Sequence, residues 1–328
     1  MALLLNREVI ERVLSMEDAI DTVEAAFGEL ASGSVDMPQR LTIADAERAG
    51  TVLCMPAYLK GMGALGVKTV TVYKNNPEGH NLPTVLATVT LLDQETGSTL
   101  SVMDGGFLTA LRTGAASGVA TKYLARKDAR VAGVFGAGAQ ARTQLWATCT
   151  VRDIERAVVH SVDSESVKRA FAERMSEKLN IEVEIAQSGR EVVEKADVLC
   201  LATTSAGPII DGDWLRPGTH INGVGSHSPG AREIDTKTIV NSKIVCDLTS
   251  ACLAEAGDLM MPVQEGALSP DGIYGDLGEL VLGTKEGRES SDEVTLFKSV
   301  GLAIQDSSVA LAAYTRARDL GLGVEFQF

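Results

Sequence analysis

The spacing of hydrophobic residues divides the first third of the chain into a helical segment and a segment rich in strands. Apolar side chains recur at helical spacing over residues 15–30, behind a capping-box pattern formed by Ser15 and Asp18, so a helix is predicted there. Short β-branched runs interrupted by Gly, Pro and Asn follow at 51–59, 64–73, 82–93 and 98–104. These runs predict an antiparallel meander with a hairpin turn at 93–98.

The rest of the chain alternates between strand and helix patterns. Small residues dominate 111–125, which predicts a closely packed helix. Beyond it, strands are predicted at 130–136, 154–162, 181–186, 196–204, 219–225 and 243–249, with helices at 139–150 and 164–179. Such alternation indicates βαβ units, and therefore an α/β fold with a mainly parallel, doubly wound sheet. One long helix is predicted over 299–321.

Charge and composition narrow the classes of partner. The chain has 30 basic and 44 acidic residues, a net charge of −14, which disfavours nucleic acid and anionic membranes as partners. Its five cysteines are scattered without a C-x-x-C pair, and no signal-peptide or membrane-spanning pattern is present. We therefore expect a reduced, cytoplasmic protein. A small anionic substrate remains compatible with the net charge, because a few local arginines suffice to bind it.

A glycine-rich turn, "GVFGAGAQA", separates the strand at 130–136 from the helix that follows. In this context Gly136 permits a tight turn, Gly138 allows the backbone to approach a pyrophosphate, and Ala141 permits close packing of helix on strand. The first amide groups of the helix, at Ala139 and Gln140, supply N–H donors for an anion. The turn is predicted to bind a dinucleotide.

The second strand of a dinucleotide fold ends beside the adenosine ribose. Here the strand ends at His160 and Ser161, with Asp163 slightly further on. An acidic residue at the tip favours NAD, whereas Ser161 leaves room for a 2′-phosphate whose charge His160, Lys168 or Arg169 would offset. The alternative, that these are solvated surface residues, is left open. NAD(P)H is the predicted cofactor, with a slight preference for NADP.

Three basic residues outside the alternating part are candidates for substrate binding: Arg40, Lys68 and Arg112. Lys68 lies within an apolar strand, where a charge is costly unless it faces a polar site. The arginine fork suits a carboxylate because it donates two parallel hydrogen bonds. The alternative, an edge-strand lysine with two surface arginines, is left open by the residues alone.

Several stretches resemble the ornithine cyclodeaminase/μ-crystallin family, among them "LPTV", "LRTGAASG", "GAGAQA", "THINGVG" and "TLFKSVGLAIQD". The resemblance extends over nearly the whole chain. It implies a homodimer whose subunits combine a Rossmann domain, residues 114–303, with an α+β substrate-binding and dimerisation domain with antiparallel strands, residues 1–113 and 304–328. Family members include ornithine and lysine cyclodeaminases, alanine dehydrogenases and reductases of cyclic ketimines.

The resemblance also implies roles for individual residues. Arg40 and Arg112 would hold the substrate's α-carboxylate, Lys68 would act on the reacting nitrogen, and Met55 would line the substrate pocket. Further cofactor contacts are implied at a set of matching positions: Thr84, Arg112, Thr203, Gly223, Val224 and Ser299.

The chain departs from the cyclodeaminases of the family at one position. They carry an aspartate in the loop after "INxVG" that handles the substrate's side-chain amine, and this chain has His227 there. A neutral histidine can act as a base but cannot pair with an ammonium group. His227 is therefore a candidate catalytic residue, or a loop residue without a catalytic role.

The resulting hypothesis is an NAD(P)H-dependent reductase of small α-imino acids, such as Δ1-pyrroline-2-carboxylate, or a closely related alanine dehydrogenase. Two alternatives remain open. One is an ornithine or lysine cyclodeaminase, and the other is a non-catalytic NAD(P)-binding protein of the crystallin kind. No metal site is predicted.

Overall fold

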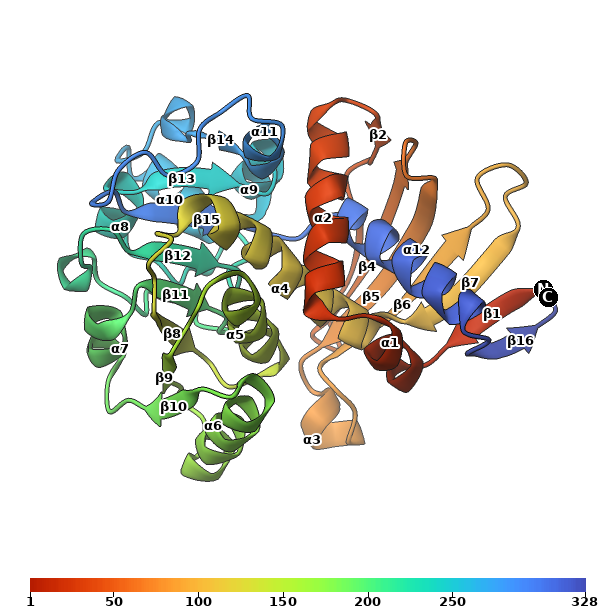
Figure 1. Cartoon of the computed structure of the whole chain (residues 1–328), viewed down its shortest axis with the longest axis horizontal. Helices are drawn as coiled ribbons and strands as arrows, with labels where there is room; N and C mark the ends of the chain where they lie inside the picture. The colour runs from red at the N-terminus through yellow and green to blue at the C-terminus, as the bar shows by residue number, and fades with distance from the viewer. The chain divides into compact units, whose positions relative to one another are not determined.

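The computed structural model describes residues 1–328, with the side chain of residue 78 excepted. The chain forms two compact units, one of residues 1–112 with 302–328 and the other of residues 113–301 (Figure 1). The first unit contains β1 (Ala2–Leu5), α1 (Arg7–Val13), α2 (Met16–Ala31), β2 (Val35–Asp36), β3 (Leu41–Asp45), β4 (Gly50–Leu59), β5 (Ala64–Tyr73), α3 (Asn76–His80), β6 (Val85–Leu92), β7 (Thr99–Asp104), the start of α4 (Gly105–Leu124), α12 (Ala303–Asp319) and β16 (Val324–Phe326).

The second unit contains the rest of α4 and most of the remaining elements. They are β8 (Val131–Phe135), α5 (Ala139–Val151), β9 (Arg156–His160), α6 (Glu165–Leu179), β10 (Glu182–Ile185), α7 (Gly189–Lys195), β11 (Val198–Leu201), β12 (His220–Gly223), α8 (Thr236–Val240), β13 (Lys243–Cys246), α9 (Thr249–Glu255), α10 (Gly257–Gln264), β14 (Gly275–Asp276), α11 (Leu277–Val281) and β15 (Thr295–Lys298). No helix among the residues that the structure describes is long and apolar enough to cross a membrane.

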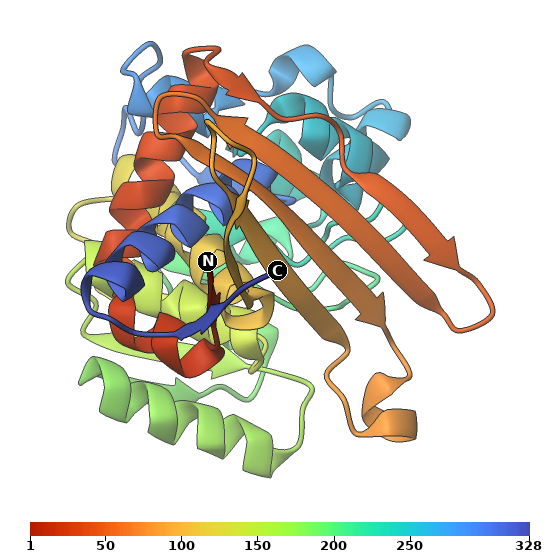
Figure 2. The same cartoon turned by 90° about the vertical axis from the view of Figure 1, so that its right-hand side faces the viewer.

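The first unit is a mostly antiparallel sheet with helices on one face. Strands β4, β5, β6 and β7 are antiparallel neighbours, as the meander pattern predicts. Helix α12 packs across β4 and β5, and α2 packs on α12 (Figure 2). The predicted capping box is present in α2, where Ser15 Oγ accepts from the Asp18 N–H and Asp18 Oδ2 accepts from the Ser15 N–H.

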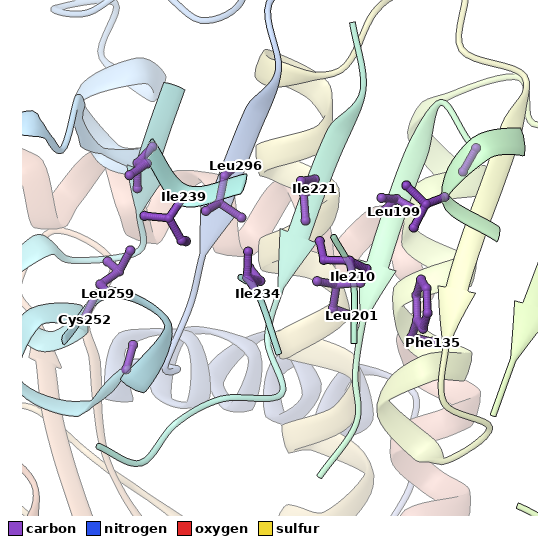
Figure 3. Close-up of a cluster of buried hydrophobic side chains, with 14 of the residues drawn as sticks. Phe135, Leu199, Leu201, Ile210, Ile221, Ile234, Ile239, Cys252, Leu259 and Leu296 are labelled. Atoms are coloured by element: carbon purple, nitrogen blue, oxygen red, sulfur yellow. The ribbon is translucent and has the colours of Figure 1, made fainter. Parts of the chain in front are cut away.

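The second unit is a parallel sheet in the order β10-β9-β8-β11-β12-β15-β13-β14. From β8 the chain proceeds to β9 and β10 on one side, then returns to add β11 and β12 on the other, as in doubly wound folds. Its strands bury side chains on both faces, as parallel sheets do. Leu199 and Leu201 of β11 belong to the core on one face, and Cys200 to the core on the other. The first of these cores contains Ile221, Ile234 and Leu259 (Figure 3).

Two helix boundaries differ from the prediction. Helix α4 begins at Gly105 and not at residue 111, because the Asp104 carboxylate accepts a hydrogen bond from the Phe107 N–H and caps the first turn. The last helix begins at Ala303 and not at residue 299, because the N–H groups of Val300 and Gly301 donate to Asp247 Oδ2 and Gly301 has φ +79°, which holds this stretch after β15 outside the helix. The strands β1, β2, β3, β14, β15 and β16 were also not predicted.

Close packing explains the small residues of α4. A Cβ atom added at Gly114 would lie 2.6 Å from the carbonyl oxygen of Thr143 in α5. The two helix backbones therefore approach so closely that only glycine fits at this position.

Candidate functional site

A buried ion cluster lies between the sheet and α12 in the first unit. Lys68 of β5 and Arg112 of α4 both pair with Asp306 of α12, at 2.8 Å from Nζ to Oδ2 and 2.9 Å from Nε to Oδ1. The side chains of Lys68 and Asp306 are only 2% and 1% exposed. Arg112 also donates from Nη1 to the side-chain oxygen of Gln305. Two of the predicted substrate-binding residues are thus brought together by a carboxylate that was not predicted.

The electrostatics of the cluster make Lys68 titratable near neutral pH. Burial lowers the pKa of Lys68 to about 7, and the positive charges of Arg112 and Arg40 act in the same direction. The Asp306 carboxylate opposes this shift by charge and hydrogen bonding. Two cations therefore share one carboxylate, so the three side chains carry a net positive charge when Lys68 is protonated.

Arg40 and Met55 belong to the same unit. Arg40 lies half-buried just before β3 and influences the charge of Lys68. Met55 of β4 is the direct cross-strand partner of Lys68 and is buried. Partners in such a pair point to the same face of a sheet, so Met55 borders the ion cluster.

The glycine-rich turn in the second unit has the geometry that a pyrophosphate requires. Gly136 has φ +101°, and a Cβ added there would lie 2.8 Å from the Ala202 carbonyl oxygen. Gly138 is the N-cap of α5, and a Cβ added there would meet no described heavy atom within 4 Å. Ala141 is fully buried. The first turn of a helix leaves its N–H groups without intrahelical partners, here at Ala139 and Gln140. The residues present therefore fit a dinucleotide.

The end of β9 carries an acidic group. Ser161 Oγ donates to Asp163 Oδ2 at 2.5 Å and accepts from the Asp163 N–H at 3.2 Å. Lys168, a candidate partner for a 2′-phosphate, is ion-paired with Glu165. A carboxylate is thus fixed where the adenosine ribose binds in this fold class.

The remaining predicted cofactor positions of the second unit lie at one edge of its sheet. Thr203 follows β11, Gly223 ends β12 with Val224 directly after it, and Ser299 follows β15. Ser299 Oγ donates to Asp247 Oδ2 at 2.7 Å, and the same oxygen accepts from the N–H groups of Val300 and Gly301. Asp247 is a buried group that sequence reasoning missed.

Two predicted residues remain, His227 in the second unit and Thr84 in the first. His227 is exposed in the loop between β12 and α8, and its catalytic role stays a prediction. Thr84 precedes β6 in the first unit, where its carbonyl oxygen accepts from the Tyr73 N–H. Among the residues that the structure describes, no group of three or more His, Cys, Asp and Glu could hold a metal ion.

Asp306 is the member of the ion cluster that sequence reasoning missed. A signal was present, because Asp306 interrupts the run of small and apolar residues "SVGLAIQDSSVALAA" as Lys68 interrupts its strand. A charge in such a run is costly unless it is paired.

Comparison with known proteins gives matches along nearly the whole chain. The sequence model of the ornithine cyclodeaminase/mu-crystallin family matches residues 1–321. A Δ1-pyrroline-2-carboxylate reductase of Bacillus cereus is 37% identical over 317 residues, covering 96% of this chain and 97% of the relative.

Two solved structures are also similar. The Thermococcus litoralis Δ1-pyrroline-2-carboxylate reductase, in complex with NADH and L-proline, has a TM-score of 0.96 and 48% identity, covering 99% of this chain and 100% of that one. An archaeal alanine dehydrogenase dimer with bound NAD has a TM-score of 0.93 and 37% identity, covering 100% of this chain and 99% of that one.

The turn geometry predicts the effect of Gly138→Ala. The added methyl group enters open space at a residue with negative φ, so the melting temperature is expected to change by less than about 2 °C. The same methyl group fills the space that a pyrophosphate needs, so NADH affinity should fall about 10-fold or more. Differential scanning fluorimetry and isothermal titration calorimetry measure the two effects. Unchanged NADH affinity in the variant contradicts the assignment.

Proposed function

The chain belongs to the ornithine cyclodeaminase/mu-crystallin family, and we propose that it is an NADH-dependent reductase of small α-imino acids. Δ1-pyrroline-2-carboxylate is the leading substrate, and the imine of pyruvate, which gives alanine, is the second. The observation that carries the proposal is the buried cationic cluster of Lys68 and Arg112 with its single carboxylate. Relatives named for these two activities support it.

We propose that the two units bind different ligands. The first unit, residues 1–112 with 302–328, binds the substrate, and the second, residues 113–301, binds the dinucleotide. Arg40 and Arg112 hold the α-carboxylate, which is an anion that arginine binds with two parallel hydrogen bonds. Asp306 holds Arg112 and Lys68 in fixed positions. The donors are therefore already oriented when the α-carboxylate of the substrate binds.

Lys68 serves as the general acid. A pKa of about 7 means that its ammonium and amine forms are both populated at neutral pH. When bound, NADH would supply the hydride that C2 of the C=N bond accepts. The Lys68 ammonium gives a proton to the imine nitrogen, which becomes an amine. In the reverse direction the neutral amine of Lys68 takes that proton back.

We further propose that NADH is preferred over NADPH. The slight preference for NADP expected from the sequence rested on the space beside Ser161. The structure fixes the Asp163 carboxylate beside that residue, and a carboxylate accepts from a ribose 2′-hydroxyl but repels a 2′-phosphate. Ion pairing of Lys168 with Glu165 removes part of the compensating charge.

A homodimer is proposed from the open face of the first unit's sheet. Strand register places Leu41 and Ile43 of β3, and Leu86 of β6, on the face opposite to Lys68. Leu41 and Ile43 are each 58% exposed. Apolar side chains gathered on one sheet face are typical of a surface that a partner covers. A second copy of the chain is the proposed partner, in keeping with the dimeric archaeal relative.

A panel of substrates tests the function directly. The purified protein should oxidise NADH with Δ1-pyrroline-2-carboxylate, or with pyruvate and ammonia, and should do so at least 10-fold more efficiently than with NADPH. The measurement is the loss of absorbance at 340 nm, with product identified by mass spectrometry. Release of ammonia from ornithine without net cofactor oxidation contradicts the proposal and identifies a cyclodeaminase.

The titration of Lys68 predicts opposite pH profiles for the two directions. Reduction needs the ammonium, so its kcat/KM should fall as pH rises through about 7, whereas kcat/KM for oxidation of the amino acid should rise through the same range. Lys68→Arg stays charged and should lose this transition, together with about 100-fold in kcat.

A variant of Asp306, the carboxylate that pairs with Lys68, provides a control for the pH profiles. Since Asp306 raises the pKa of Lys68, Asp306→Asn should shift both transitions to lower pH. Identical profiles for the wild type and Lys68→Arg rule out Lys68 as the proton donor.

The dimer is tested by placing a charge on the open sheet face. Ile43→Glu should convert a dimeric wild type largely to monomer in analytical ultracentrifugation, because burying an unpaired carboxylate is costly. Leu282→Glu is the matched control, since Leu282 is also exposed, at 47%, but lies in the second unit. A wild type that sediments as a monomer overturns this part of the proposal.

A further inference from the structure

The second unit contains a network of three buried charges. Glu233 lies in the loop before α8, Asp258 in the first turn of α10, and Lys298 at the end of β15, and all are fully buried. Lys298 Nζ lies 2.7 Å from Asp258 Oδ2. Burial lowers the pKa of Lys298, but the carboxylates of Asp258 and Glu233 outweigh that effect and keep it above its ordinary value.

The Glu233 side chain accepts hydrogen bonds from backbone N–H groups and a hydroxyl in the turns that follow β11 and β12. Its Oε1 accepts from the N–H and from Oγ1 of Thr203, both at 2.7 Å, and its Oε2 accepts from the Gly225 N–H at 2.8 Å. One carboxylate therefore joins the turn after β11 to the turn after β12. A Cβ added at Gly225 would lie 2.3 Å from Oε2, so the loop is shaped around this carboxylate.

The other two charges hold Glu233 in place. Asp258 Oδ1 accepts from the N–H groups of Glu233 and Ile234, at 2.7 Å and 3.0 Å. Lys298 donates from Nζ to the carbonyl oxygen of Gly223, at 3.1 Å. Ile234 and Leu259, the next residues after Glu233 and Asp258, are buried in the hydrophobic core (Figure 3). The network is thus anchored on the core and fixes the ends of β11 and β12.

The strand order indicates which half of a dinucleotide binds at the ends of β11 and β12. A doubly wound sheet binds a dinucleotide across the point where the strand order reverses, with one nucleotide over each half. The adenosine half belongs to β8 and β9, so the nicotinamide half belongs to β11 and β12. Since these are the two strands that Glu233 joins, we propose that Glu233 is a positioning residue that shapes the nicotinamide half of the site without touching the substrate. This inference rests on the proposed function.

Glutamine at this position has the same shape but cannot make the same bonds. All three partners of the Glu233 side chain are donors, and a glutamine must turn its NH₂ group towards one of them. Two buried donors that face each other without an acceptor destabilise the contact between the Glu233 side chain and the two turns. The two turns are then expected to move apart, which affects the nicotinamide half but leaves the Gly136–Ala141 turn intact.

Binding of NADH and of ADP-ribose, which lacks the nicotinamide, provides the test. In Glu233→Gln the Kd for NADH should rise about 10-fold while that for ADP-ribose changes less than about 2-fold. Glu233→Asp keeps the carboxylate on a shorter side chain, so its NADH affinity should lie between those of the wild type and the glutamine variant. Isothermal titration calorimetry gives the affinities, and thermal melting shows that each variant is folded.

Asp197→Asn is the matched control. The Asp197 carboxylate also accepts from two backbone N–H groups, of Arg130 and Val131, but at the amino end of β8. This variant should melt at a lower temperature with an unchanged ratio of NADH to ADP-ribose affinity. Equal loss of both ligands in Glu233→Gln, no loss of either, or failure of both Glu233 variants to fold where Asp197→Asn folds overturns the inference. A wild type that binds no NADH instead overturns the proposed function.

Discussion

The buried carboxylate of Asp306 is the interaction on which the first unit depends. Lys68 and Arg112 place two positive charges between an apolar sheet and a helix, where each is costly and where they repel one another. Asp306 pairs with both and offsets part of this cost. One carboxylate pairs with two cations, so the cluster carries a net positive charge when Lys68 is protonated. The lowered pKa of Lys68 follows mainly from its burial, to which the positive charge of Arg112 adds.

The second unit uses buried carboxylates for another purpose. Asp247 and Glu233 accept hydrogen bonds mainly from backbone N–H groups and hydroxyls in the turns that follow the strands. A carboxylate can accept several such bonds at once, so each one fixes a stretch of irregular backbone. In the first unit a buried acid orients the two cations that we propose to bind the substrate, whereas in the second it orients the main chain.

The sequence predicted what depends on local pattern and missed what depends on distant partners. The meander of β4–β7, the capping box at Ser15 and the turn at Gly136 were predicted because hydrophobic spacing and glycine placement are local properties. The short strands β1 and β16 were missed, since each has few residues and is defined by its pairing with the other. The roles of Asp306 and Glu233 depend on residues far away in the chain, and single-sequence patterns do not encode such contacts.

The first unit is discontinuous in the chain, since α12 returns to it after the whole of the second unit. During synthesis on a ribosome, residues 1–112 therefore emerge long before the helix that covers β4 and β5. Until residue 306 is translated, Lys68 has no carboxylate beside it, and the sheet face around Met55 stays uncovered. We therefore expect the N-terminal part to stay incomplete while the parallel sheet is made, until the final helix covers the sheet face and pairs Asp306 with Lys68.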